Sequence, residues 1–237
     1  MLPPERFTPR ARRGALFKQL YPYRNIISIS AVFTTAAFQL INLPICIQIC
    51  SNRSTHGYLP HPSIGNLVIN IIMMKYAAIL CQSVLYYASV MGAILNIAYL
   101  MLFNCYAMDP FVEVQLPFSI AIVFIVLVLG YTYIEDDVNL PRRFGVLLVF
   151  IYTFYLAAPL ILADGDSLPQ TISYVSLPMY IIGFLMSAAW FALETIFNNL
   201  YLQIAHALGL VAYGAQLALA FVLDGLMLFS DECDDEV

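Results

Sequence analysis

The chain has 237 residues, of which 62% are hydrophobic and only 11% are charged, and its mean hydropathy is +0.82. An ordinary soluble domain has about 45–50% apolar and about 25% charged residues, so the composition excludes that class and indicates a polytopic membrane protein. The charged residues are unevenly placed: the N-terminal segment (residues 1–25) holds six basic residues against one acid, and the C-terminal tail (residues 230–237) holds five acids. Neither segment predicts a folded surface that binds nucleic acid.

Five cysteines are present, an odd number, and their spacing matches no metal site: Cys46, Cys50, Cys81, Cys105 and Cys233. Four of them lie in or beside apolar segments, where a free cysteine packs as a small hydrophobic residue. We therefore expect no disulfide framework, no metal site and no cofactor.

The apolar segments predict an all-α fold with seven membrane-spanning helices. We expect them at residues 26–50, 63–81, 84–106, 116–134, 144–163, 173–195 and 200–229. The first contains Leu43-Pro44, which should kink it because proline removes a backbone donor. The apolar run at 63–107 is too long for one span of about 20 residues, so we place a turn at Gln82-Ser83.

Three landmarks recur in order at nearly one offset, which indicates a duplicated unit of three helices. The offsets are 115, 116 and 117 residues, for the pairs Pro44 and Pro159, Pro62 and Pro178, and Gly92 and Gly209. The predicted units are residues 26–107 and 141–229, joined by a linker helix with its flanking loops at 108–140. Two three-helix units separated by one helix have the same membrane orientation, a parallel repeat of the form 3+1+3.

The segment 176–216 predicts a helical hairpin that carries the only tryptophan, Trp190, and the histidine His206. The polar residues Glu194-Thr195 and Asn198-Asn199 mark its turn. Two antiparallel helices would hold Trp190 and His206 at similar depth, facing one cavity. An aromatic face stacks on the C–H face of a pyranose and an imidazole binds hydroxyl groups, so this pair favours a sugar site.

The same segment resembles the second triple-helix unit of the SWEET sugar transporters. The resemblance rests on Ser176-Leu177-Pro178, Trp190, His206 three residues before Gly209, and Gln216 seven residues after that glycine. It extends over about residues 32–222, with first-unit similarities in the segment LPICIQICSNRST and at Pro62, Tyr76, Gly92-Ala93 and Tyr99. We expect an animal, nematode-type member.

The resemblance implies four substrate-binding residues. The family tryptophan of helix six falls on Trp190, and its partner in helix two falls on Met73. The two family asparagines, in helices three and seven, fall on Ser89 and His206. A hydroxyl both donates and accepts, and a neutral imidazole does one of each, so hydrogen-bonding capacity is kept although its reach differs.

The resemblance also implies hinges and gates. The candidate pivots are the prolines Pro44, Pro62, Pro159 and Pro178, although Pro44 and Pro178 each lie two residues beyond the family position. Tyr76 and Asn199 are gate candidates, and Asn199 stands where the family often has an aspartate. Lys75 and Glu194 lie near helix ends, where each either extends to the membrane surface or joins the other in a gate-closing ion pair.

The implied function is facilitative, bidirectional transport of a mono- or disaccharide by alternating access. No acid lies in the middle of a span, which favours uniport. His206 is the exception to be tested, because the ordinary histidine pKa of about 6.5 would make transport sensitive to pH. No nucleophile, base and acid converge, so we expect no enzyme. The expected partners are the sugar, the lipid bilayer and further copies of the chain.

Orientation and rival functions stay open from sequence. The family places the N-terminus outside, whereas the excess of basic residues at that end favours the cytosol. We expect the plasma membrane, with the Golgi or another endomembrane as the alternative. The rival functions are a PQ-loop-like exporter of amino acids or other small solutes, for which Pro169-Gln170 supplies one dipeptide, and a non-transporting receptor or assembly factor.

Overall fold

The computed structural model describes the backbone of residues 20–162 and 176–234, and the side chains of residues 20–157 and 177–221. Pro169-Gln170 lies outside the described residues. Every regular element in the described ranges is helical. The helices are η1 (Tyr21–Tyr23), α2 (Arg24–Leu40), α3 (Leu43–Asn52), α4 (His61–Ile79), α5 (Ser83–Tyr106), the π-helix η2 (Phe111–Gln115), α6 (Leu116–Ile134), α7 (Leu140–Leu162), α9 (Ser176–Phe197) and α10 (Leu200–Asp234).

Seven helical segments in the described part of the chain are long and apolar enough to cross a membrane, which confirms the predicted fold class. The first combines α2 and α3, and the fourth combines η2 and α6. The predicted turn at Gln82-Ser83 is also found, because α4 ends at Ile79 and α5 begins at Ser83. The division into two repeats stays a prediction.

The four candidate pivot prolines lie in different settings. Pro44 is in the first turn of α3, directly after the interruption at residues 41–42, so the expected kink is a break between two helices. Pro62 and Pro178 are in the first turns of α4 and α9, where a proline removes no hydrogen bond within the helix. Pro159 belongs to α7, but its side chain lies outside the described part.

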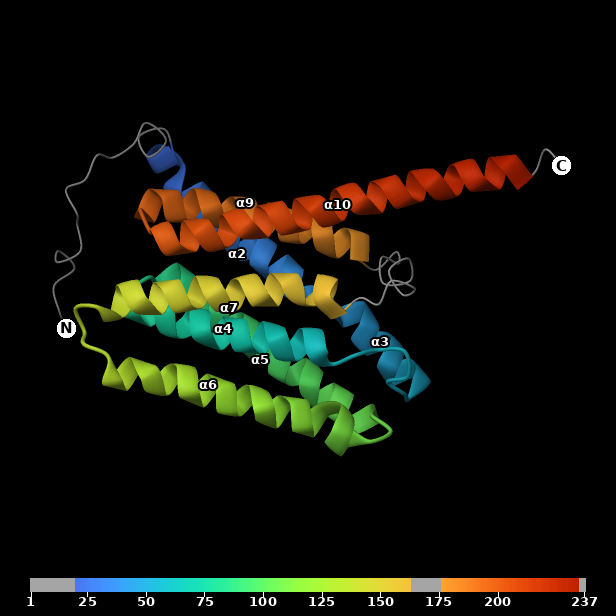
Figure 1. Cartoon of the computed structure of the whole chain (residues 1–237), viewed down its shortest axis with the longest axis horizontal. Coiled ribbons are helices and arrows are strands. Elements are labelled where there is room, and N and C mark those ends of the chain that lie inside the picture. The colour runs from blue at the N-terminus through green and yellow to red at the C-terminus, as the bar shows by residue number, and fades with distance from the viewer. Residues whose placement is uncertain (1–19, 163–175, 235–237) are drawn as a thin grey trace.

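The helices form a bundle in which α2 links two groups (Figure 1). Helix α4 packs on α5, and α9 packs on α10, while α2 contacts both α5 and α9. Helix α7 lies between α4 and α10, and α6 covers α4 on the outside. The connections at residues 80–82, 135–139 and 198–199 lie together at one end of the bundle, which we call the α9–α10 end. The opposite end, which carries α3, is called the α3 end.

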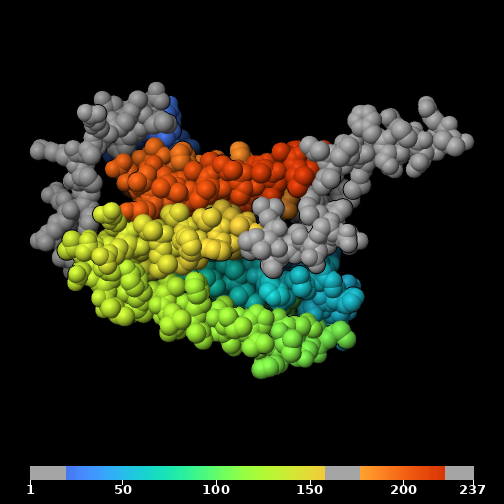
Figure 2. Space-filling model, in the orientation of Figure 1, coloured from blue at the N-terminus to red at the C-terminus, as the bar shows by residue number. Residues whose placement is uncertain are grey.

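The outer faces of the helices are apolar, as a lipid-facing surface requires. On α6, for example, Ile120, Val123 and Leu127 are all exposed. The space-filling view shows helix α6 along the outer edge of the bundle, beside α4 and α7 (Figure 2). Buried between the helices is a large core that includes Tyr76 and Phe144, whose rings stack with their centroids 6.0 Å apart.

Helices α9 and α10 approach closely because Gly183 has no side chain. A Cβ atom at Gly183 would lie 2.8 Å from the ring of Tyr213 on α10. Gly130 on α6 differs, because a Cβ atom there would meet nothing within 4 Å.

We predict that Gly183→Ala destabilises the protein by about 1–3 kcal/mol, the usual cost of overpacking. Gly130→Ala is the matched control and should be neutral or slightly stabilising, because alanine favours a helix. Thermal unfolding in detergent measures both variants. Equal transition temperatures for the two would show that the approach of α9 to α10 does not depend on this glycine.

Candidate functional site

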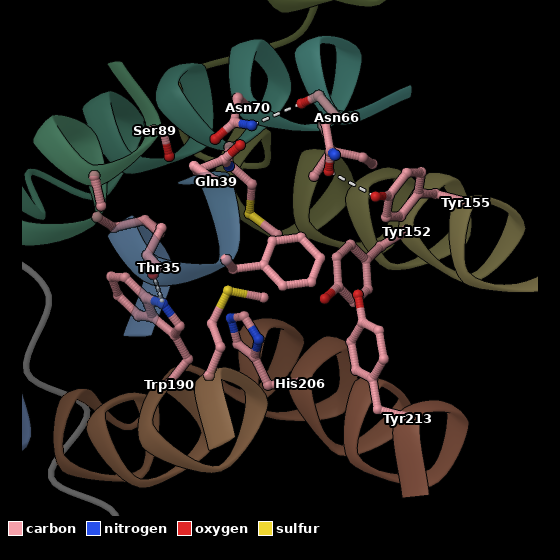
Figure 3. A pocket seen from close by; sticks show the side chains of 16 residues that line it. Thr35, Gln39, Asn66, Asn70, Ser89, Tyr152, Tyr155, Trp190, His206 and Tyr213 are labelled. Atoms are coloured by element: carbon pink, nitrogen blue, oxygen red, sulfur yellow. Dashed lines mark hydrogen bonds between the residues drawn. The ribbon is translucent and has the colours of Figure 1, made fainter. Parts of the chain in front are cut away.

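A narrow cavity lies at the centre of the bundle, and side chains from α2, α4, α5, α7, α9 and α10 line it (Figure 3). Its volume is about 70 Å³, well below the roughly 300–1,000 Å³ of typical ligand pockets. A ligand of sugar size therefore enters only if helices or side chains move. In the described part of the chain, no group of three or more His, Cys, Asp or Glu side chains could hold a metal ion.

The structure brings all four predicted substrate residues to this cavity. Trp190, His206, Ser89 and Met73 are buried and line it together. The indole and imidazole rings are stacked, with their centroids 5.9 Å apart and their planes inclined by 16°. The hairpin α9–α10 thus places Trp190 and His206 side by side, at the same depth, as the sequence predicts.

Trp190 is fixed by a hydrogen bond that crosses the bundle. Its Nε1 donates to Oγ1 of Thr35 on α2, at 2.8 Å. The Thr35 hydroxyl in turn donates to the carbonyl of Ala31, at 2.7 Å. Both Thr35 and Trp190 are buried. The indole is therefore held in one orientation by α2, with its polar edge satisfied and its face turned toward His206.

His206 has aromatic neighbours but no polar partner. Its ring stacks on Trp190 and meets the edge of Tyr152, at a centroid distance of 6.0 Å. Neither Nδ1 nor Nε2 forms a hydrogen bond within the protein, and 4% of the residue is exposed. A buried polar group without a partner is costly. The imidazole is thus placed to bind a ligand hydroxyl group.

The prediction from sequence missed a set of polar residues on α2 and α4 that also line the cavity. Thr35 and Gln39 are four residues apart on α2, and Asn66 and Asn70 are four apart on α4 (Figure 3). This spacing places each pair on one helix face. Polar residues inside an apolar span face the protein interior. The sequence alone could therefore have identified both pairs as residues of the bundle interior.

These residues form hydrogen bonds that tie the helices together around the cavity. Tyr155 of α7 donates its hydroxyl to Oδ1 of Asn66, at 2.6 Å. Asn96 of α5 donates Nδ2 to Oε1 of Gln39, at 2.8 Å. Asn70 approaches α5 where Gly92 has no side chain, since a Cβ atom at Gly92 would collide with the Asn70 Oδ1 atom.

The two gate candidates meet at the α9–α10 end. Tyr76 of α4 donates its hydroxyl to Oδ1 of Asn199, at 3.5 Å. Around this contact Leu193 and Leu202 are fully buried, and Tyr76 is only 1% exposed. The α9–α10 end of the bundle is therefore closed in this structure.

The ion pair suggested between Lys75 and Glu194 is wrong. Nζ of Lys75 lies over the ring of Tyr133 on α6, 5.1 Å from its centroid, a cation–π arrangement on the outer side of the bundle. Glu194 is fully buried and accepts a hydrogen bond from Nε2 of Gln82 instead, at 3.2 Å. The lysine side chain extends outward to α6 while the carboxyl lies inside.

We predict that Thr35→Val, which removes only the hydroxyl, leaves the Trp190 N–H unsatisfied and costs about 1–3 kcal/mol. Trp190 is the only tryptophan, so fluorescence reports on it alone, and its emission should shift to shorter wavelength. The control is Thr34→Val, because Thr34 bonds only to carbonyls of its own helix. An unchanged Thr35→Val emission spectrum would contradict the hydrogen bond.

Comparison with known proteins gives three findings. Residues 25–110 match the model of a family described as a sugar efflux transporter for intercellular exchange. The chain is 24% identical over 200 residues to the sugar transporter SWEET1 of Caenorhabditis elegans; the match covers 84% of this chain and 65% of that protein, less than two thirds of its length. A solved structure of a eukaryotic SWEET transporter superposes with a TM-score of 0.66 at 18% identity and covers 84% of this chain and 99% of its own.

The three matches cover different parts of the chain. The family model spans the first three predicted membrane helices, the curated relative extends the sequence match into the second half, and the solved structure has the same fold. Together they confirm that the chain resembles the SWEET family in sequence and has the fold of a SWEET transporter.

Proposed function

We propose that the protein is a facilitative, bidirectional sugar uniporter that works by alternating access. The observation that carries the proposal is the stacked pair of Trp190 and His206, buried in a central cavity to which both halves of the chain contribute side chains. The family resemblance and the printed descriptions of the relatives support sugar as the substrate class.

The chemistry of the cavity suits a sugar ring. The indole face of Trp190 offers an apolar surface for the C–H face of a pyranose. The two unpartnered nitrogens of His206 supply one donor and one acceptor for hydroxyl groups, and the Ser89 hydroxyl supplies another of each. Met73 adds a flexible apolar side chain that adapts to ligands of different shape. A mostly apolar cavity with a few placed polar groups is the usual form of a small-molecule site.

The size and central position of the cavity support alternating access. Because its volume is about 70 Å³, helices or side chains must move before a sugar fits. The contact between Tyr76 and Asn199 closes the α9–α10 end, and we propose these residues as its gate. The interruption before Pro44 divides the first span into two helices and is the best-placed hinge among the four prolines.

The described residues that line the cavity do not form a proton relay. No aspartate or glutamate is among them, so the one histidine, His206, has no carboxyl partner there, whereas coupled carriers generally carry chains of titrating groups. Downhill uniport is therefore the simplest mechanism. We extend the proposal to a homo-oligomer in the plasma membrane, or alternatively the Golgi, with the N-terminus outside, on the resemblance alone.

The first test is flux of labelled glucose, and then of a disaccharide, into liposomes that contain the purified protein. We predict that wild type equilibrates at least one of these sugars and that Trp190→Ala and His206→Ala each reduce the flux at least tenfold. Loss of about 1.4 kcal/mol of binding lowers affinity tenfold, and each side chain should contribute at least that much.

The control variants change exposed residues on the same two helices. Phe184→Ala on α9 and Ile204→Ala on α10 alter partly exposed side chains outside the cavity and should transport as wild type does. Amino-acid flux without sugar flux would favour the PQ-loop-like exporter. Failure of every solute to equilibrate would favour a receptor or assembly factor, and either result overturns the proposal.

A second prediction separates the role of the imidazole from its volume. His206→Asn restores the residue that the family has at this position and keeps both a donor and an acceptor. His206→Leu keeps a buried side chain but offers neither. We expect His206→Asn to transport with an altered preference among sugars, and His206→Leu to lose transport while its thermal stability is kept. Equal transport by the two variants would exclude hydrogen bonding by His206.

A further inference from the structure

Glu194 is a buried carboxyl with too few hydrogen-bond donors. It lies in the last turn of α9 at the α9–α10 end and is 0% exposed. One oxygen, Oε2, accepts from Nε2 of Gln82, which belongs to the connection between α4 and α5. The other oxygen, Oε1, has no partner, and neither has Oε1 of Gln82. Two buried oxygens on adjacent side chains therefore both lack a donor.

The neighbouring polar groups do not supply that donor. Gln203 of α10 donates its Nε2 to the backbone carbonyl of Glu194, not to its carboxyl group. The backbone N–H of Asn199 is also bonded to that carbonyl, and the Asn199 side-chain Nδ2 reaches no acceptor. Tyr76 donates its hydroxyl to Asn199.

No cation in the described part of the chain compensates for a charge on Glu194. Lys75 of α4 lies over Tyr133, and Arg24 of α2 lies over the ring of Phe197, 5.3 Å from its centroid. Among the other titratable groups of the packed helices, Tyr76 of α4 interacts electrostatically with both Glu194 and Tyr201, although its hydroxyl donates to Asn199. His206 stacks on Trp190. An ionised carboxylate is strongly disfavoured in such a place, because it is out of water and has no opposite charge beside it.

A second carboxyl at the same end, that of Glu135, has the hydrogen-bond donors and the cation that stabilise an ionised carboxylate. Glu135 accepts the hydroxyl of Tyr131 at 2.6 Å and Nη1 of Arg143 at 2.9 Å. The Tyr131 hydrogen bond and the Arg143 guanidinium hold the pKa of Glu135 below its ordinary value. Glu194 has neither a second donor nor a cation beside it.

We propose that Glu194 is a proton-binding site that is occupied when the α9–α10 end is closed and is emptied when that end opens. The proton gives Glu194 the O–H donor that its surroundings lack, and Oε1 of Gln82 is the adjacent unpartnered acceptor. Opening separates α9 from the α4–α5 connection and admits water, to which the carboxyl releases the proton. Closure takes one proton back from the same side. The proton thus controls the gate without crossing the membrane.

The sign of the pH effect follows directly. Because the closed state binds one proton more than the open state, acid favours closure and alkali favours opening. The ratio of open to closed molecules should rise with pH, by up to about tenfold per unit in the range where only the closed state is protonated. The proposal rests on the proposed function only because it assumes that the α9–α10 end has an open and a closed state. Its test needs no sugar.

The experiment measures the distance between spin labels at Ser83→Cys and Leu200→Cys, both exposed positions at the α9–α10 end. The labelled protein, with its five native cysteines replaced by alanine, is placed in lipid nanodiscs and measured from pH 5 to pH 9. We expect the longer distance to gain population as the pH rises. In Glu194→Gln, whose amide is neutral and supplies a donor at every pH, the closed distance should dominate throughout.

Glu135→Gln is the matched control, because it removes a carboxyl at the same end, and it should respond to pH as wild type does. A pH response that persists in Glu194→Gln, or is absent from wild type, overturns the proposal. So does a distance change at constant pH when sodium and potassium are replaced by N-methylglucamine, because a metal cation would then be the ligand.

Infrared spectroscopy of the unlabelled wild-type protein keeps the test independent of any variant that does not fold. The stretching band of a protonated carboxylic acid should be present at acid pH and disappear with alkali over the same range as the distance change. Absence of this band in the closed state would overturn the proposal. Failure of sugar flux in liposomes would overturn the proposed function but leave both spectroscopic results standing.

Discussion

The hydrogen bond from Trp190 to Thr35 determines the arrangement of the central cavity. It joins α9 to α2 across the bundle, at 2.8 Å, between two buried side chains. With the indole N–H satisfied, the ring presents its face to His206, and the imidazole is packed in turn against Tyr152. The Thr35 hydroxyl of α2 therefore orients the indole on which the imidazole stacks.

A bilayer makes polar groups expensive on the outside of the bundle, because lipid offers no hydrogen bonds. The chain accordingly places polar side chains between its helices, and most of them pair, as Asn66 does with Tyr155 and Gln39 does with Asn96. His206 in the cavity does not pair. Since an unpartnered buried polar atom is retained at a cost, this site points to a ligand that supplies the missing interaction.

The fold could be predicted from the sequence because its signals are long and local. Apolar runs predict the spans, and the break before Pro44 follows from the missing donor of proline. The pair of Trp190 and His206 was predicted because tryptophan and histidine are rare in this chain, whereas Ser89 and Met73 were predicted only from the family resemblance. Thr35 was missed because a threonine in a helix bonds equally well to its own backbone, and only the fold shows that it reaches Trp190. The direction of Lys75 depends on α6, which spacing along α4 cannot reveal.

Helix α9 connects the cavity to the closed end. Trp190 and Glu194 are four residues apart and lie on the same face of α9, one turn apart. A movement of α9 that separates Glu194 from Gln82 also displaces Trp190 relative to α4 and α5, because one turn of α9 carries both side chains. A sugar bound to Trp190 and a proton bound to Glu194 would then both shift the equilibrium between the open and closed states of the α9–α10 end. Such coupling is reciprocal, so a sugar that favours closure also strengthens proton binding by an equal factor.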